Sequence, residues 1–200
     1  MKLRLITTLL ILCSALMGCE KELPVYGGEV LTREGLQYKP NSTVPLTAKV
    51  ERFRENGQLE TQYTVIDGKG EGVLKRWHEN GQLEGEWPYV NNKIEGVQKQ
   101  WHENGQLKGE WTYVNDKREG TSKQWHENGQ LSGEWTYVND KIEGTSKNWH
   151  ENGQLRGEWH YVNGREDGVR QLWHENGEER APTCYKAGEK VDMSYCEAKE

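Results

Sequence analysis

The chain has 200 residues, of which 33% are hydrophobic, and it contains nine Trp and nine Tyr but only one Phe. Such a composition cannot fill a deep core of Leu, Ile and Val, although aromatic rings could cover one face of a sheet. The formal net charge of -6 argues against nucleic acid as a partner, because phosphate contacts require a concentrated basic surface. It also argues against simple electrostatic adhesion to anionic lipids.

The start of the chain has the features of a bacterial lipoprotein signal peptide. Two basic residues, Lys2 and Arg4, precede an apolar run from Leu5 to Leu12 that is too short to span a bilayer. The motif Leu-Met-Gly-Cys that ends at Cys19 resembles the lipobox, in which the cysteine thiol receives diacylglycerol. We therefore expect Cys19 to be lipidated and the protein to be anchored in the cell envelope, at the inner or the outer membrane. The alternatives are a cleaved secretory peptide and a membrane-spanning anchor.

Two cysteines remain for the rest of the mature chain. Cys13 would leave with the signal peptide, so the pair consists of Cys184 and Cys196. In an oxidising envelope this pair is expected to form a disulfide, and the alternative is two free thiols. Two thiolates are too few for a zinc site made of cysteines.

Residues 20–47 contain three prolines and show no clear periodicity. We expect this segment to be a tether with at most a short strand. The expected organisation is a signal peptide over residues 1–18, a lipidated N-terminus and tether over 19–47, a repeat array over 48–191, and a C-terminal tail with Cys196 over 192–200.

From residue 48 onward the sequence repeats with a period of 24 residues. One unit, EGVQKQWHENGQLKGEWTYVNDKR, covers residues 95–118, and four units are nearly identical. Degenerate copies of the unit flank these four, as expected for terminal repeats that cap a stack. The aromatic residues that keep this period are expected to hold the sheet by packing on one another, with a binding face for a glycan or a peptide as the alternative: Trp77, Trp87, Trp101, Trp111, Trp125, Trp135, Trp149, Trp159, Trp173, Tyr89, Tyr113, Tyr137 and Tyr161.

Each unit contains two short alternating segments separated by Glu-Asn-Gly, which predicts a β-hairpin. A three-residue loop that ends with Gly105 in the left-handed conformation brings Trp101 opposite Leu107. A two-residue turn would instead oppose Trp101 with Lys108. We expect the three-residue loop, which places on one face Val97, Trp101, Leu107, Trp111 and Tyr113.

The same alternation predicts how successive hairpins pair. With Tyr89 opposite Glu95, the side chain of Trp87 lies opposite Val97 and Leu83 lies opposite Trp101. Four periodic lysines then share the aromatic face, where their stems would pack beside the rings or, alternatively, bind an anionic ligand: Lys75, Lys99, Lys123 and Lys147. The other face is expected to be hydrated and carries Gln98, Gln100, His102, Lys108, Glu110 and Thr112.

The sequence therefore predicts an all-β fold, an elongated single-layer antiparallel meander of repeated β-hairpins. The right-handed twist of strands should coil this sheet into a trough. Because the sequence offers no second sheet, the aromatic face must pack on itself or bind a ligand.

The unit resembles the MORN repeat in its Glu-Asn-Gly turn, the following Leu-x-Gly-Glu-Trp-x-Tyr and the closing Glu-Gly. More narrowly, it is similar to the bacterial variant MORN repeat of YwqK-type antitoxins, over about residues 48–191. The resemblance implies an interaction platform, used in protein assembly and sometimes in lipid contact. One departure is the turn between units, which is Asn-Asn or Asn-Asp in three copies where the family often has glycine.

Five periodic histidines invite a metal hypothesis: His78, His102, His126, His150 and His174. Equivalent residues of successive units lie about 10 Å apart, whereas zinc ligands lie about 2.1 Å from one centre. We therefore expect hydrated histidines and no metal site. The sequence also lacks a Gly-x-Ser-x-Gly elbow, a phosphate loop and a His-Glu-x-x-His motif, so we expect neither an enzyme nor a cofactor.

The expected function is that of a lipid-anchored envelope scaffold that binds an unidentified protein and reaches the membrane through Cys19. One alternative is an antitoxin or immunity protein that neutralises a cognate toxin in the envelope. Another alternative is a glycan or peptidoglycan binder, in which rings about 10 Å apart meet alternate sugars.

Overall fold

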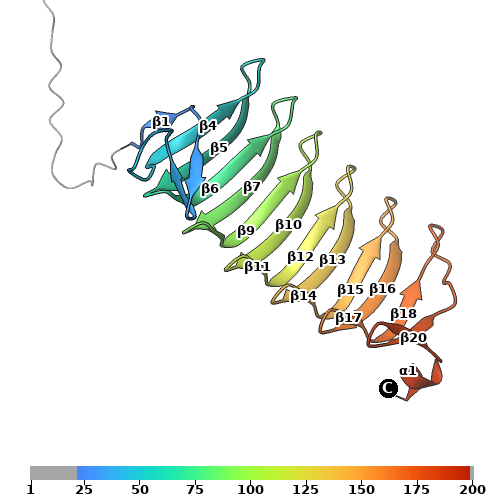
Figure 1. Cartoon of the computed structure of the whole chain (residues 1–200). Helices are drawn as coiled ribbons and strands as arrows, with labels where there is room; N and C mark the ends of the chain where they lie inside the picture. The colour runs from blue at the N-terminus through green and yellow to red at the C-terminus, as the bar shows by residue number, and fades with distance from the viewer. Residues whose placement is uncertain (1–21, 199–200) are drawn as a thin grey trace, which may run out of the picture.

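The computed structural model describes residues 22–198 and shows a ladder of β-hairpins stacked along one long axis (Figure 1). The expected signal peptide and Cys19 lie outside the described residues. The strands form one 18-stranded sheet and a separate two-stranded sheet. This confirms the predicted all-β meander. Within the described part of the chain, no helix has the length and hydrophobicity that a membrane span requires.

The central units, from β8 to β16, each contribute one short strand and two long strands, and the end units keep part of this pattern. The first long strands, which lead into the Glu-Asn-Gly turns, are β4 (Ala48–Phe53), β6 (Lys69–Trp77), β9 (Gly96–Trp101), β12 (Gly120–Trp125), β15 (Gly144–Trp149) and β18 (Gly168–Leu172). The second long strands are β5 (Leu59–Ile66), β7 (Leu83–Val90), β10 (Leu107–Val114), β13 (Leu131–Val138) and β16 (Leu155–Val162). The short strands follow the turns between units and are β8 (Lys93–Ile94), β11 (Lys117–Arg118), β14 (Lys141–Ile142) and β17 (Arg165–Glu166).

The Glu-Asn-Gly turns have the predicted three-residue loop. Trp101 pairs with Leu107, and the main-chain N–H of His102 donates to the carbonyl of Gln106 at 2.9 Å. Gly105 has φ +82°, a left-handed conformation that side chains with a Cβ rarely adopt. The expected turn and the Trp101–Leu107 pairing are therefore confirmed.

The predicted division of the two faces is wrong, because a β-bulge follows each turn. Between Leu107 and Gly109 the register shifts by one residue, so Trp111 pairs with Gln98 and Thr112 pairs with Val97. A shift of one residue reverses the face on which every following side chain lies. Val97 therefore lies on the face opposite Trp111.

The junction between units also differs from the predicted pairing. Tyr89 pairs with Ile94 rather than Glu95, across a two-residue turn in which Asn91 and Asn92 have φ +52° and +67°. These are the positive angles of a tight hairpin turn, which Asn tolerates better than most residues. The chain then shifts register at Gly96, so that Gly85 pairs with Gln100. Continuing this register brings Trp87 beside Gln98 instead of Val97.

The segment expected to be a tether is folded from Val25 onward and caps the first hairpin. Strand β1 (Val25–Tyr26) pairs with β4 in parallel, and β2 (Leu31–Arg33) forms a hairpin with β3 (Leu36–Tyr38). Beneath this cap lies the aliphatic core of the described chain, which consists of Leu46, Ala48, Val50 and Val65. The sequence did not predict this cap, because its strands are too short to show a periodic pattern.

The other end is closed by β19 (Thr183–Lys186), β20 (Glu189–Val191) and the short helix α1 (Ser194–Glu197). A disulfide joins Cys184 on β19 to Cys196 on α1, with 6.0 Å between their Cα atoms. Both cysteines are buried. The segment expected to be a tail is thus fixed against the last hairpin.

Candidate interaction surface

One face of the sheet, here called the aromatic face, carries the central tryptophans Trp87, Trp111, Trp135 and Trp159. Each ring folds back over the glycine two residues before it. A Cβ placed on Gly109 would lie 2.2 Å from Cη2 of Trp111, and the other three units show the same contact at 2.1–2.3 Å. The Gly-Glu-Trp motif is therefore a packing motif, in which glycine leaves the space that the indole occupies.

Small or slender polar residues separate these rings. Trp111, Trp135 and Trp159 pair across the sheet with Gln98, Ser122 and Ser146, whose exposed fractions are 7%, 0% and 0%. The hydroxyls of both serines have no hydrogen-bond partner among the described residues. The expectation that Gln98 faces water is therefore wrong, because the bulge turns it toward the rings.

The opposite face, here called the outer face, carries a row of ion pairs. Lys99 lies 3.1 Å from Glu110, and the equivalent pairs in the three other central units measure 2.9–3.3 Å. The expectation that these lysines share a face with Trp111 and the equivalent tryptophans is therefore wrong. Because these side chains keep 29–45% of their surface exposed to solvent, each pair contributes little to stability, about 0–1 kcal/mol.

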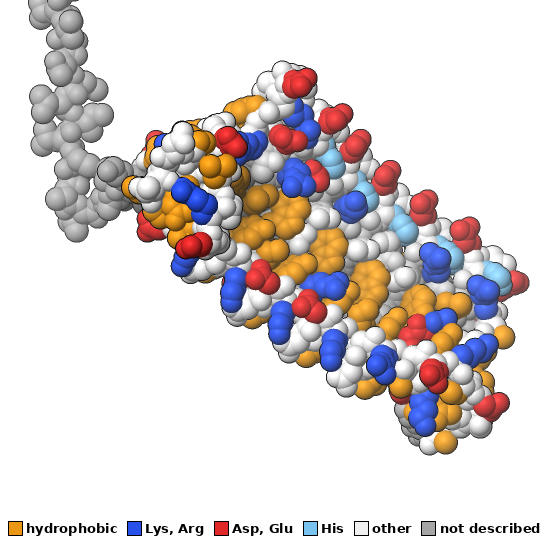
Figure 2. All heavy atoms as spheres, viewed as in Figure 1, with side chains coloured by type: hydrophobic (Ala, Val, Ile, Leu, Met, Phe, Trp, Pro, Cys, Tyr) orange, Lys and Arg blue, Asp and Glu red, His pale blue; other side chains and the backbone are white. Residues whose placement is uncertain are grey.

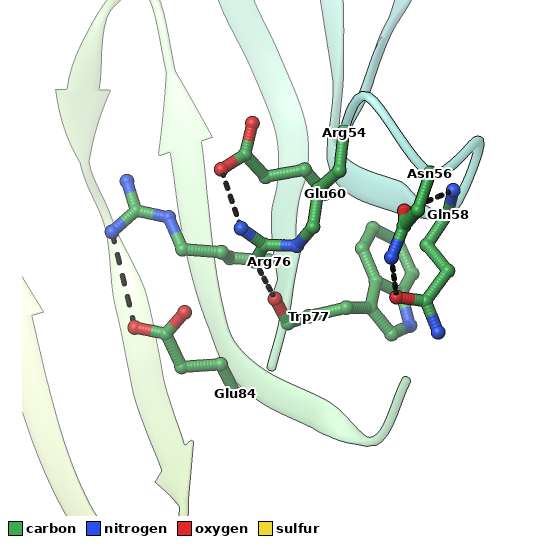
Figure 3. Close-up of polar contacts among 7 residues, drawn as sticks. All are labelled: Arg54, Asn56, Gln58, Glu60, Arg76, Trp77 and Glu84. Carbon is green, nitrogen blue, oxygen red and sulfur yellow. Dashed lines mark hydrogen bonds and ion pairs between the residues drawn. The ribbon is translucent and has the colours of Figure 1, made fainter. Parts of the chain in front are cut away.

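The histidines join each unit to the next at the edge formed by the Glu-Asn-Gly turns, here called the tip edge. Nε2 of His102 lies 2.9 Å from the carbonyl oxygen of Trp125, one unit further along. His78, His126 and His150 make the same contact at 2.9–3.1 Å. In the first unit Arg54 takes this place and donates to the carbonyl of Trp77 at 2.8 Å, while it also binds Glu60 (Figure 3).

This histidine ladder corrects the prediction that the histidines are simply hydrated. A second ladder runs beside it, because Nδ2 of Asn104 donates to the carbonyl of Glu127 at 2.8 Å, and Asn80, Asn128 and Asn152 repeat the contact. Among residues 22–198, no group of three or more His, Cys, Asp or Glu side chains is placed to hold a metal ion. The tip edge is thus held by side chain to main chain bonds.

The turns between units form the other long edge, here called the junction edge. Oδ1 of Asp116 accepts a hydrogen bond from the main-chain N–H of Ile94 at 2.7 Å, and Asn92 and Asp140 do the same for Gly70 and Arg118. This explains why these turns carry Asn or Asp where glycine is often found. A glycine would fit the positive φ but could not accept this bond.

The periodic tyrosines lie at the junction end of the aromatic face. Burial raises the pKa of Tyr89, Tyr113 and Tyr161 above the ordinary value, so these hydroxyls stay protonated at neutral pH. The hydroxyl of the buried Tyr137 accepts a hydrogen bond from Nη1 of Arg118 at 3.1 Å, and the guanidinium lies over the same ring.

The expected aromatic residues therefore divide into three rows. Trp87, Trp111, Trp135 and Trp159 form the central row, and the tyrosines flank it at the junction end. The remaining tryptophans sit at the ends of the first long strands, close to the tip edge. Figure 2 shows hydrophobic side chains running along the length of this face, with no second layer of described residues over them.

Hollows follow the tip edge beside the histidine ladder, and together they are called the tip channel here. One of about 520 Å³ is lined by His78, Trp101, His102, Lys108 and Glu127, among others. Another of about 400 Å³ is lined in the same way by His126, Trp149, His150, Arg156 and Glu175. A third, of about 620 Å³, continues the channel at the last unit, where Trp173, His174 and Arg180 contribute.

A stack of near-identical hairpins joined by side-chain ladders, with one open aromatic face, defines a β-hairpin repeat protein built as a surface rather than around a pocket. The sequence profile of the MORN repeat variant matches four consecutive segments, residues 70–91, 94–115, 118–139 and 142–163. These four units belong to the MORN repeat variant family. They comprise the central hairpins, from β6 to β16.

The comparison with curated proteins gives no significant match. Among solved structures, the chain is similar to a mutant of TarM from S. aureus in complex with fondaparinux, α-GlcNAc-glycerol and UDP, at 11% identity and a TM-score of 0.32. This similarity covers 48% of the chain and 19% of that protein, so the chain spans about a fifth of its length.

Proposed function

We propose that this protein is an interaction scaffold that binds a protein partner along its aromatic face and is held at a bacterial envelope membrane by lipid on Cys19. MORN repeats are in general scaffolds for interaction with proteins or membranes. The proposal assigns this role to one face of the array and gives the array a fixed location.

The observation that carries the proposal is the open row of central tryptophans. Their rings are half-buried against glycine and against their neighbours across the sheet, and no sheet or helix formed by residues 22–198 covers them. Aromatic residues held rigid in this way lose little conformational entropy on binding and are enriched at protein interfaces. On the outer face, by contrast, the lysine and glutamate side chains form ion pairs with one another.

Lipid on Cys19 would place the array close to the membrane. Strand β1 begins at Val25, six residues after Cys19, and a fully extended chain of that length spans about 20 Å. The folded cap therefore shortens the tether that the sequence suggested. A partner in the same membrane, or at its surface, would lie within reach of the aromatic face.

Site-specific photo-crosslinking tests the proposal. A benzoylphenylalanine at position 113 replaces a half-buried tyrosine of the aromatic face, and the same residue at position 114 replaces a valine that is 45% exposed on the outer face. We expect a defined crosslinked protein in living cells from position 113 and none from position 114. Equal crosslinking from both positions, or none from position 113 in a correctly folded variant, would contradict the proposal.

The identity of the crosslinked protein separates two forms of the proposal. A toxic enzyme encoded beside this protein would make the scaffold an immunity protein. A structural envelope protein would make it an assembly platform.

Glycan binding is a second candidate, favoured by the amide groups beside the central rings. Gln100, Gln124 and Asn148 pair with the glycines over which the indoles lie. Amides and aromatic faces together suit sugars, which present both hydroxyl groups and apolar ring faces. Retention on purified cell-wall material that is lost in Trp111→Ala and kept in Val114→Ala would support this candidate.

A further inference from the structure

The tip channel has a chemistry of its own, and of its three hollows only the one at the last unit reaches the central tryptophan row, at Trp159. Its outer rim carries one exposed glutamate per unit, in every Glu-Asn-Gly turn: Glu55, Glu79, Glu103, Glu127, Glu151 and Glu175. Figure 2 shows acidic side chains in a line along one long edge, with histidine side chains just inside it. Basic side chains in the channel are fewer, with Lys108, Arg156 and Arg180 lining the hollows.

The tryptophans that line the channel carry unused hydrogen-bond donors. The main-chain carbonyl oxygens of Trp101 and Trp149 already accept hydrogen bonds from His78 and His126 of the histidine ladder. The indole N–H of neither residue has a partner among the described residues. Each unit therefore offers an aromatic ring, one free N–H donor and one exposed carboxylate, in the same arrangement every two strands.

We propose that the tip channel binds a proline-rich, basic polypeptide in the polyproline II conformation. The inference rests on the proposed function and names the class of partner and the part of the surface that holds it. A polyproline II chain makes no internal hydrogen bonds, so its carbonyl groups are free to accept from indole N–H groups. Aromatic-lined grooves are a general way of holding such chains.

The repeat distances agree with this assignment. Two strands of a sheet span about 9.6 Å, which is the spacing of equivalent groups along the channel. A polyproline II helix has three residues per turn and rises about 9.3 Å per turn, so every third residue presents the same side at almost the same interval. An extended β-strand has a period of two residues, about 6.6 Å, which does not match the spacing of about 9.6 Å between the units.

The negative charge of the rim carboxylates favours a proline-rich peptide that carries basic residues. One carboxylate per unit at the rim matches one Lys or Arg at every third position of the peptide, with prolines between them. The same carboxylates repel a polysaccharide that carries acidic groups. The channel thus favours a basic peptide over an anionic glycan.

Fluorescence anisotropy with labelled synthetic peptides tests the inference on the full-length protein in detergent solution. The first peptide repeats Arg-Pro-Pro five times. The second has the same composition with irregular arginine spacing, the third replaces proline by glycine and serine at the same charge, and a chito-oligosaccharide serves as the glycan probe. We expect the regular peptide to bind at least ten-fold more tightly than either control peptide.

Matched triple variants locate the binding site. Replacing Glu103, Glu127 and Glu151 by Gln removes three charges from the rim. Replacing Glu110, Glu134 and Glu158 by Gln removes three from the ion pairs of the outer face. We expect about ten-fold weaker binding of the regular peptide by the rim variant, since each exposed ion pair contributes a few-fold at most, and little change for the outer-face variant.

Several outcomes would overturn the inference. They are equal binding of the regular and irregular peptides, equal loss in both triple variants, and binding of the chito-oligosaccharide but of no peptide. If the peptides fail while position 113 still crosslinks a protein and position 114 does not, the proposed function stands and only the class of partner is wrong. Circular dichroism of each variant checks that the array is folded.

Discussion

Nε2 of His102 lies 2.9 Å from the main-chain carbonyl oxygen of Trp125, a residue that is 23 positions further along the chain. This bond crosses from one hairpin to the next outside the regular sheet pairing. Repeated along the array, it fixes the spacing of the turns at the tip edge. The array therefore depends on side chains at its edges as well as on ring packing at its centre.

Loss of one rung of this ladder should destabilise the array. We expect His126→Ala to lower the free energy of unfolding by about 1–2 kcal/mol, because the partly buried carbonyl of Trp149 loses its donor. His174 is exposed at the end of the ladder, so His174→Ala should change stability by less than about 0.5 kcal/mol. Denaturant unfolding compares the two, and equal losses would mean that the bond has no role in stability.

The contact between Gly109 and Trp111 predicts a strong coupling. Gly109→Ala forces the indole away from its place and should cost about 1–3 kcal/mol, the usual range for overpacking. In a Trp111→Ala background the same glycine change should cost much less, because nothing then occupies the space. A double-mutant cycle of unfolding free energies measures this, and additive effects would show that the indole does not pack over Gly109.

Removal of a buried, unpartnered hydroxyl should stabilise the protein. Ser122 is 0% exposed and its hydroxyl has no partner among the described residues, so Ser122→Ala should raise the free energy of unfolding by about 1 kcal/mol. Thr121→Val, on the exposed neighbouring residue, is the control and should have little effect. A clear loss of stability in Ser122→Ala would reveal a hydrogen bond to that hydroxyl, such as one to an ordered water.

Deletion of one whole unit should leave a shorter folded array. Without residues 95–118, His78 meets the carbonyl of Trp125 in place of that of Trp101, and all ladders close again. Deleting only residues 107–118 removes one long strand, which reverses every following strand and breaks both ladders. Circular dichroism and thermal melting should show native-like spectra for the first deletion only. Similar damage from both would argue against independent units.

The proposed lipid anchor predicts a specific change on Cys19→Ser. The variant keeps the apolar run that we expect to direct export but loses the thiol proposed as the lipid acceptor, so labelling with palmitate should vanish and the hairpin array should fold unchanged. Two or more acyl chains hold a protein firmly at a membrane, whereas one holds it only marginally. Mass spectrometry of the mature N-terminus provides the direct measurement. An unmodified N-terminus at another position in the wild type would remove the basis for the proposed location.

Short-range features of the sequence determined the hairpins, the 24-residue period and the three-residue turn. These depend on residues close together in the chain, such as Gly105, which adopts a positive φ at low cost. The two-residue turn at Asn91 and Asn92 was also within reach of sequence analysis, because Asn tolerates the positive φ that such turns require. Alternation alone favoured Glu95 as the partner of Tyr89, and that choice was wrong.

The tertiary structure alone decided which residues share a face. A bulge of one residue at Lys108 moves Val97 to the outer face and turns Gln98 toward the rings. Periodicity could not reveal this, because both faces carry apolar side chains, and Val97 is 47% exposed while the polar Gln98 is buried. The histidine ladder was hidden for a related reason, since the partner of His102 is a main-chain carbonyl, which any residue provides. The sequence by itself thus determined the repeated hairpin, whereas pairing between strands determined the aromatic face, the outer face and the tip channel, because a shift of one residue exchanges the faces at almost no cost to local structure.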